Sequence, residues 1–191
     1  KQSGFSLVET LVAITILLIV ITGPLTLVSN SARSTNFAND QVMAFFLAQE
    51  GLELVQAERD DLLIPKFSTP PPAGDAWDDF TSTGGSNILR NCFGAGGCGL
   101  DQETDSSGNL RQYDCSTASN CRLYFNATAD QRSTYTHVPS ANASRYTRVI
   151  TLDETSTGQV EVVSTVTWRS DGQRGTQEVQ ATTYLFDVYG R

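Results

Sequence analysis

The first 28 residues contain an apolar run that is long enough to cross a membrane. From Phe5 to Val28 the only charged residue is Glu9. As a helix rising about 1.5 Å per residue, this run would reach about 36 Å, more than the roughly 30 Å of a bilayer core. A carboxylate in such a segment costs up to roughly 3 kcal/mol, and membrane carboxylates usually have a partner and a function. The position of Glu9 therefore needs an explanation.

Two ordinary membrane segments explain the run incompletely. A cleaved secretory signal has a shorter apolar core followed by a small-residue cleavage site, and no such site follows Leu25. A plain signal anchor accounts for the length but gives Glu9 no role.

The stretch KQSGFSLVE at residues 1–9 resembles the processing site of type IV prepilins and of secretion pseudopilins. The resemblance implies that a membrane peptidase cuts after Gly4 and that Phe5 is then N-methylated. It also implies that Glu9 pairs with the terminal amine of a neighbouring subunit during filament assembly. Each charge would then offset the cost of removing the other from water.

On this interpretation residues 1–4 are the remnant of a leader, and residues 5–28 form the helix that spans the membrane and later the filament core. The chain does not begin with Met, so we expect that its natural start has been trimmed. Gly23 and Pro24 interrupt the run, because proline removes a helical hydrogen bond. They are either a tolerated kink or, as the resemblance implies, a soft point that yields when the subunit leaves the bilayer.

Residues 29–61 are expected to continue the helix as an amphipathic segment. Its polar first part, residues 29–39, either frays or stays helical. From Gln41 onward the apolar residues Val42, Phe45, Phe46, Leu52 and Val55 have helical spacing, with the polar Gln49 among them. We expect one helix from Phe5 to about Asp61, with this stripe packed on a sheet, although Gly51 costs about 1 kcal/mol relative to Ala. The run FFLAQEGLELVQAERD at 45–60 resembles minor pilins of the PilV-like type.

The middle region, about residues 65–143, begins with a connector. Pro65 and the prolines at 70–72 are expected to end the helix. The sequence GDAWDDF at 74–80 predicts a single helical turn that packs Trp77 and Phe80 on the core. Carbohydrate stacking on Trp77 is the alternative.

Four cysteines indicate an oxidising compartment and disulfide bonds. Cys92 and Cys98 have five residues between them, as do Cys115 and Cys121. Three connectivities are open, and local pairing is favoured. The spacing does not match a zinc site, and no C-x-x-C redox pair is present.

Asp101, Glu103 and Asp105 alternate like the ligands of a calcium loop. However, Ser106 and Gln112 occupy the positions that need Gly and Glu, so a hairpin turning at residues 105–108 is favoured.

The C-terminal third predicts an antiparallel sheet at about residues 146–189. Residues 146–152, 159–168 and 177–189 alternate in polarity, and an Asp-Gly turn signal lies at 169–175. One face of the second run collects Val160, Val162, Ser164, Val166 and Trp168. A long helix followed by an antiparallel sheet predicts an α+β fold, with a globular domain at 62–191. The resemblance implies the type IV pilin fold.

No catalytic residue, metal ligand or cofactor site is expected. His137 is the only histidine and is expected at an exposed or strand-end position, and GAGG at 94–97 lacks the rest of a phosphate loop. The net charge of −8 argues against a general nucleic-acid binder. The glycosylation patterns at Asn126 and Asn142 are near chance in a chain rich in Ser, Thr and Asn.

The sequence thus predicts a minor type IV pilin. Its expected partners are a prepilin peptidase, the inner-membrane assembly machinery and other pilin subunits. Its globular domain would face outward and serve assembly, adhesion, motility or DNA uptake. The surface ligand is unknown, and nucleic acid is a disfavoured but open alternative. The alternatives are a minor pseudopilin of a type II secretion system and a membrane-anchored extracellular binding domain.

Overall fold

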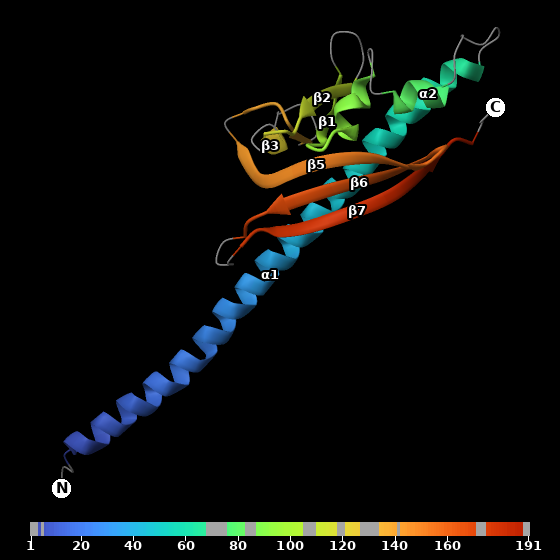
Figure 1. Ribbon diagram of the computed structural model, residues 1–191. Coiled ribbons are helices and arrows are strands. Elements are labelled where there is room, and N and C mark those ends of the chain that lie inside the picture. Colours follow the sequence, from blue (N-terminus) through green and yellow to red (C-terminus); the bar gives the residue numbers. More distant parts are fainter. Residues whose placement is uncertain are drawn as a thin grey trace. The chain divides into compact units, whose positions relative to one another are not determined.

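The computed structural model describes residues 4, 6–67, 76–82, 87–104, 110–117, 121–126, 134–140, 142–170 and 175–188. The chain forms two units, residues 1–40 and residues 41–191. The first unit is the start of one helix, and the second holds the rest of that helix together with a sheet (Figure 1).

The helix α1 runs without a break from Leu7 to Leu63. The polar segment 29–39 is helical, so the structure selects continuation over fraying. The helix ends where the sequence predicts, because Pro65 disfavours the α conformation in the residue before it. A short 3-10 helix, η1 (Ile64–Phe67), follows.

A seven-stranded sheet follows α1, and every strand pair in it is antiparallel. The expected α+β class is therefore confirmed, and the layout is consistent with the type IV pilin fold. The strands are β1 (Cys98–Thr104), β2 (Leu110–Asp114), β3 (Arg122–Asn126), β4 (Thr134–Thr136), β5 (Ala143–Ser156), β6 (Gln159–Trp168) and β7 (Gln177–Phe186). Two short helices precede them, α2 (Ala76–Thr81) and η2 (Ile88–Phe93).

The strand β5 organises the sheet. One of its edges pairs with β6, which in turn pairs with β7, so the expected C-terminal meander is confirmed. Its other edge pairs with β3 near Thr147 and with β1 at Ile150. The sequence did not predict that the middle region joins this same sheet. It did predict the β1–β2 hairpin, whose turn at 105–108 lies outside the described residues, as does the Asp-Gly turn before β7.

The face that α1 buries differs from the one expected. Val42, Phe45 and Phe46 are exposed, and of the expected stripe only Val55 is fully buried. The buried set combines three small residues with three larger apolar ones: Ala44, Leu47, Ala48, Gly51, Leu54 and Val55.

Close packing of the helix on the sheet explains this correction. A Cβ on Gly51 would stand 2.4 Å from Ser164 Oγ and 3.3 Å from Arg148 Cδ, both on the sheet. Small side chains allow the helix backbone to come this near, whereas a phenylalanine stripe would hold it away. Gly51, which weakens the isolated helix, is therefore required by the packing.

The core gathers residues from α1, the two short helices and the sheet. Trp77 and Phe80 pack into it with ring centroids 5.4 Å apart, which confirms the predicted aromatic turn. Since Trp77 is only 7% exposed, it offers no face to a carbohydrate, and that alternative is wrong. The predicted inner face of β6 is confirmed, because Val160, Val162, Ser164, Val166 and Trp168 are all buried.

Candidate processing and assembly site

Gly4 lies ahead of the helix and is exposed. The helix begins around the carbonyl of Ser6, which accepts from Glu9 N at 3.0 Å and from Thr10 N at 3.2 Å. A Cβ on Gly4 would find nothing within 4 Å, so the fold of this chain does not itself require glycine there. If glycine is required at this position, the requirement would have to come from another protein that binds the segment around Gly4. Phe5 lies outside the described residues.

Glu9 is exposed in the first turn of α1. A carboxylate at this end of a helix interacts favourably with the helix dipole, worth about 0.3–1 kcal/mol. Among the described residues, none forms an ion pair with its carboxylate. Glu9 therefore has a stable place in the helix, and its charge remains available to a group outside the described chain.

The apolar run of α1 is exposed along its whole length. Every side chain from Leu7 to Val28 is exposed, including large ones such as Leu7, Ile19 and Leu27 at 77, 72 and 71%. By length and composition this helix can cross a membrane. Such a surface is stable only when lipid or another protein covers it.

The hydroxyl groups of this run are satisfied within the helix. Thr10 Oγ1 donates to Leu7 O at 2.8 Å, and Thr15 Oγ1 donates to Val12 O at 2.8 Å. Because the hydroxyls bond to the helix's own carbonyls, the run presents no unpaired threonine donor to an apolar medium.

Gly23 and Pro24 stand inside the helix rather than at its end. Proline has no N–H, so one helical carbonyl loses its donor here. Thr22 and Thr26 flank the pair, and Thr26 Oγ1 donates to Gly23 O at 2.7 Å. A Cβ on Gly23 would meet nothing within 4 Å, so no packing within the chain requires glycine at this point.

The four cysteines form two local disulfides, Cys92–Cys98 and Cys115–Cys121. This is the connectivity that the spacing favours. The first bond ties η2 to the start of β1 inside the core. The second spans the connection between the end of β2 and the start of β3. Among the described residues no group of three His, Cys, Asp or Glu side chains is arranged to hold a metal.

Arg148 forms a buried charge network that the sequence analysis missed. Its guanidinium lies between helix and sheet, where Nη1 contacts Glu50 Oε2 at 2.9 Å and donates to Leu47 O at 3.3 Å. Nη2 donates to Leu100 O at 2.7 Å. Arg148 thereby joins α1, β1 and β5. The alternation of β5 does place it on the inner face, which is the one signal that could have found it.

His137 follows directly after β4, so the strand-end expectation holds and the exposed alternative is wrong. It is 2% exposed, and it has a carboxylate partner, Asp101, which is 1% exposed. Its Nδ1 lies 2.7 Å from Asp101 Oδ1, and its backbone N–H donates to the same carboxylate at 2.9 Å. Thr136 Oγ1 donates to Asp101 Oδ2 at 2.7 Å. The partners are 36 residues apart, so no local pattern reveals them.

The environment of Asp101 favours its charged form. Burial works to raise the pKa of this carboxyl, but the hydrogen bonds and charge of His137, together with the Thr136 hydroxyl, hold the pKa below its usual value. Tyr113 stacks on the His137 ring at 5.2 Å, and burial and then the Asp101 charge raise the pKa of Tyr113.

The buried Asp–His pair is arranged for structure. The second ring nitrogen of His137, Nε2, faces the backbone of Gly99, where even a Cβ would come within 2.6 Å. No substrate can approach that nitrogen in this packing, so the pair secures the end of β4 against β1. It also explains Asp101, whose carboxylate serves Thr136 and His137 rather than a calcium loop.

Comparison with known families matches the start of the chain. Residues 1–23 match the model of the prokaryotic N-terminal methylation motif. No curated protein and no solved structure matches the chain. The motif supports a precursor of the type IV pilin or pseudopilin kind, hence a structural subunit that a prepilin peptidase processes and that assembles with other pilins.

Proposed function

We propose that the protein is a minor type IV pilin, inserted in the cytoplasmic membrane and then assembled into an extracellular filament. The observation that carries the proposal is the coincidence of three features at one end of the chain. These are the methylation motif at 1–23, an exposed Gly4 ahead of the helix, and a membrane-length apolar helix with Glu9 in its first turn.

The roles of Gly4, Phe5 and Glu9 follow from two covalent steps. Hydrolysis of the Gly4–Phe5 peptide bond would leave a carboxylate on Gly4 and a new amine on Phe5. The peptidase would then transfer a methyl group to this amine from a sulfonium methyl donor, which leaves as a thioether while the amine loses a proton. A charged amine and the Glu9 carboxylate are each costly in an apolar filament core, and pairing between neighbouring subunits would offset both costs. The pair would also fix the axial register of the subunits, as single buried polar residues do in coiled coils.

Processing is tested on protein isolated from its native membrane. Mass spectrometry of the N-terminal peptide should show loss of residues 1–4 and one added methyl group on Phe5. Deleting the prepilin peptidase, or the substitution Gly4→Leu, should leave the leader attached. An intact segment 1–4 in cells that carry an active peptidase would refute the proposal and favour a plain membrane-anchored binding domain.

Assembly is tested at Glu9. The substitution Glu9→Val should leave membrane insertion unchanged and abolish recovery of the protein in sheared filaments, because the amine of the neighbour loses its partner. The matched control is Glu53→Val, which removes another exposed carboxylate of α1. Normal incorporation of the Glu9 variant would contradict the pairing.

A minor pseudopilin of a type II secretion system is the second candidate, since the methylation motif fits it equally. Deletion of the gene separates the two. Loss of filaments or of filament-dependent behaviour favours the pilin, and loss of exoprotein secretion with filaments intact favours the pseudopilin.

A further inference from the structure

The strand β7 forms a long, regular edge of the sheet. Three strands stand at an edge, namely β2, β4 and β7. Of these, β4 has three residues, and β2 has five and pairs with β1 through an irregular register. In contrast, β7 pairs with β6 over all ten of its residues without a bulge, and β6 is its only partner among the described strands. This edge is therefore long enough to take up another full strand.

The backbone of β7 directs alternate amide groups away from the sheet. Asp187 N donates to Gly158 O at 2.8 Å, and the next pair in the register is Phe186 with Gln159. Hydrogen-bonded and non-bonded pairs alternate along an antiparallel ladder, so the odd-numbered residues of β7 bond to β6. The N–H and C=O groups that point outward along the edge are those of Glu178, Gln180, Thr182, Tyr184 and Phe186.

The side chains at this edge are incompletely covered on both faces of the sheet. On the inner face every residue of β6 is buried, whereas Val179, Ala181 and Thr183 of β7 are only half-buried. On the outer face Tyr184 and Phe186 are 47 and 53% exposed. A strand added to this edge would therefore extend the core on one side and cover two aromatic rings on the other.

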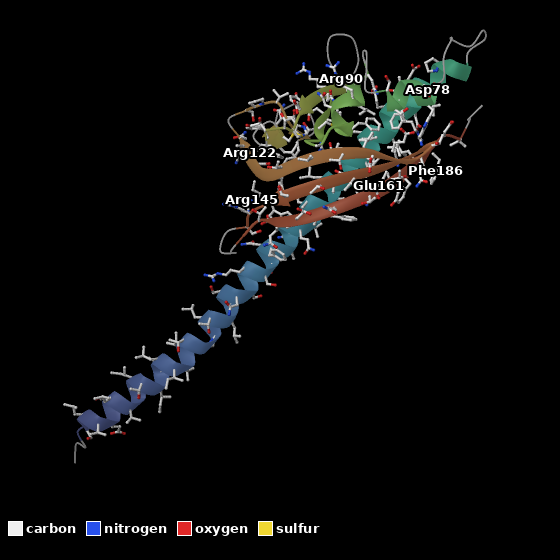
Figure 2. The ribbon with its side chains drawn as sticks, in the orientation of Figure 1. Asp78, Arg90, Arg122, Arg145, Glu161 and Phe186 are labelled. Carbon is white, nitrogen blue, oxygen red and sulfur yellow. A yellow bond between two sulfur atoms is a disulfide. The ribbon has the colours of Figure 1, made fainter. Side chains whose placement is uncertain are left out.

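The strand β7 lacks the features that protect sheet edges against pairing. Natural edge strands are guarded by proline, lysine, bulges or short length. None of these occurs in β7, whose only charged residue is Glu178. The Tyr184 hydroxyl donates to Glu161 on β6, which fixes the ring, and Figure 2 shows Phe186 and Glu161 at this end of the two strands. The edge thus presents a preformed surface for a strand.

We propose that β7 accepts an antiparallel strand from another protein. The occupant is an extended segment that begins with apolar residues opposite Phe186 and Tyr184 and ends with a basic residue opposite Glu178. Its backbone bonds to the outward amides of β7, and its alternate side chains complete the inner face of the sheet. This surface lies beyond the proposed filament function, since it requires neither leader cleavage nor filament assembly.

A second copy of β7 matches this edge poorly. Antiparallel self-pairing centred on Thr182 places Phe186 of each copy opposite Glu178 of the other, and Tyr184 opposite Gln180. A register that places Tyr184 opposite Phe186 of the other copy confines the pairing to residues 184–186. Self-pairing therefore matches either the length of the strand or its aromatic residues, whereas a foreign segment matches both.

The experiment measures binding of a peptide to the full chain in detergent micelles, by isothermal titration and by NMR. The probe is the capped peptide VTITTVTVK, whose first residue is designed to lie opposite Phe186 and whose lysine is designed to lie opposite Glu178. We expect saturable binding with a dissociation constant below about 1 mM. Absence of binding at millimolar peptide by both methods overturns the proposal.

Two methylated peptides test whether the backbone carries the contact. N-methyl groups on the peptide residues opposite Tyr184 and Gln180 remove amides that face β7, so binding should fall at least about tenfold. N-methyl groups on the residues opposite Thr183 and Ala181 lie on the far edge of the added strand, so binding should stay within about threefold. Equal losses from both peptides overturn the proposal, because an added strand pairs through one edge only.

A matched pair of variants locates the strand on β7. Thr182→Pro removes an outward N–H, which an edge strand tolerates, and should weaken binding at least about tenfold. Thr182→Ala keeps this N–H and should change binding less than about threefold. Unchanged binding by Thr182→Pro, in a variant whose tryptophan fluorescence is native, overturns the proposal.

Amide exchange of the wild-type chain gives a reading that needs no variant. With the peptide bound, the N–H groups of Gln180, Thr182 and Tyr184 should exchange at least about tenfold more slowly. Those of Ala181 and Thr183 already bond to β6 and should change little. Slowing that is absent, or uniform along β7, contradicts strand addition.

Two further outcomes assign the edge differently. Dimers of the full chain that form without peptide and dissociate in the Thr182→Pro variant assign β7 to a second copy. Equal binding of the peptide after its lysine is replaced by glutamate shows an edge without the proposed preference for a basic residue. Each result overturns the proposed occupant without bearing on processing at Gly4 or pairing at Glu9.

Discussion

The two halves of α1 use the same backbone in opposite ways. Residues 7–28 expose large apolar side chains throughout, whereas residues 41–63 bury one face, in which Ala44, Ala48 and Gly51 alternate with larger apolar residues, against the sheet. In the second half the cover for the helix is part of the same chain. In the first half it must be supplied from outside, by lipid or by neighbouring helices. The difference is therefore the buried face: the first half has none, whereas the second half, although it exposes Phe45 and Phe46, has one in which small residues allow close approach to the sheet.

The charges of the two halves differ in the same way. Glu50 has its partner within the fold, 2.9 Å away at Arg148. Glu9 has no ion-pair partner among the described residues. Four tests, one of them a pair of substitutions, probe the difference between the two units, and we order them from the largest expected effect on the second unit to the smallest. The two tryptophans, both buried in this unit, report on its unfolding.

The largest effect is expected from Arg148→Leu. This change leaves Leu47 O and Leu100 O without their donor and Glu50 without its cation, and breaking a buried pair costs about 3–5 kcal/mol. Urea unfolding of the full chain in detergent should show the loss. Arg33→Leu, an exposed change in the first unit, serves as control. Equal midpoints for the two variants would contradict the contrast.

The next effect is expected from Asp101→Asn, at about 2–3 kcal/mol near neutral pH, because hydrogen bonds to a charged group are lost. The folded-state pKa of Asp101 lies below the ordinary value of 3.8 for this carboxyl. Its contribution is therefore present above about pH 4 and disappears as the pH falls through the folded-state pKa.

The pH profile supplies the check on Asp101. The difference in unfolding free energy between wild type and variant should shrink as the pH is lowered from 6 towards 3. A difference that stayed constant over this range would show that the carboxylate charge contributes nothing.

A matched glycine pair tests the packing directly. Gly51→Leu should lower the free energy of unfolding by about 1–3 kcal/mol or more, because the new side chain collides with Ser164 and Arg148. Gly23→Leu should leave it unchanged, since a Cβ there finds open space. Similar losses from both substitutions would remove the distinction between the two halves.

The smallest effect on stability is expected from Pro24→Ala. It restores a helical hydrogen bond in the first unit, so amide exchange at residues 21–27 should slow while unfolding of the second unit stays unchanged. Exchange as slow in the wild type as in the variant would mean that Pro24 is no soft point.

Hydrophobic periodicity, together with the proline and glycine residues at the ends of elements, predicted the long helix, its end before Pro65, the aromatic turn and the C-terminal meander. These features depend on local signals such as alternation along β6, which the structure reproduces residue by residue. The candidate processing residues Gly4 and Phe5 also come from one short motif, and their role stays a prediction.

Features set by distant partners were not predictable. The helix stripe was misassigned because Phe45 and Phe46 have the right spacing, yet the close approach of β5 and β6 selects Ala44, Ala48 and Gly51. Asp101 and His137 are far apart in the sequence and come together only in the folded sheet. Arg148 is a charged residue on the inner face of β5, and its burial is possible because Glu50 on α1 supplies the opposite charge.

The two disulfides each close a loop between cysteines six positions apart, and neither reaches α1. Apart from the backbone itself, a tensile load passing from the helix into the sheet would therefore run through non-covalent contacts. These are the packing of Leu54 and Val55 in the core and the hydrogen bonds that Arg148 makes to Leu47, Glu50 and Leu100. Such a joint yields by peeling the helix from the sheet while the crosslinked loops keep their shape. The disulfides thus hold the shape of two local loops, and the resistance of the joint to peeling depends on the helix–sheet packing together with Arg148.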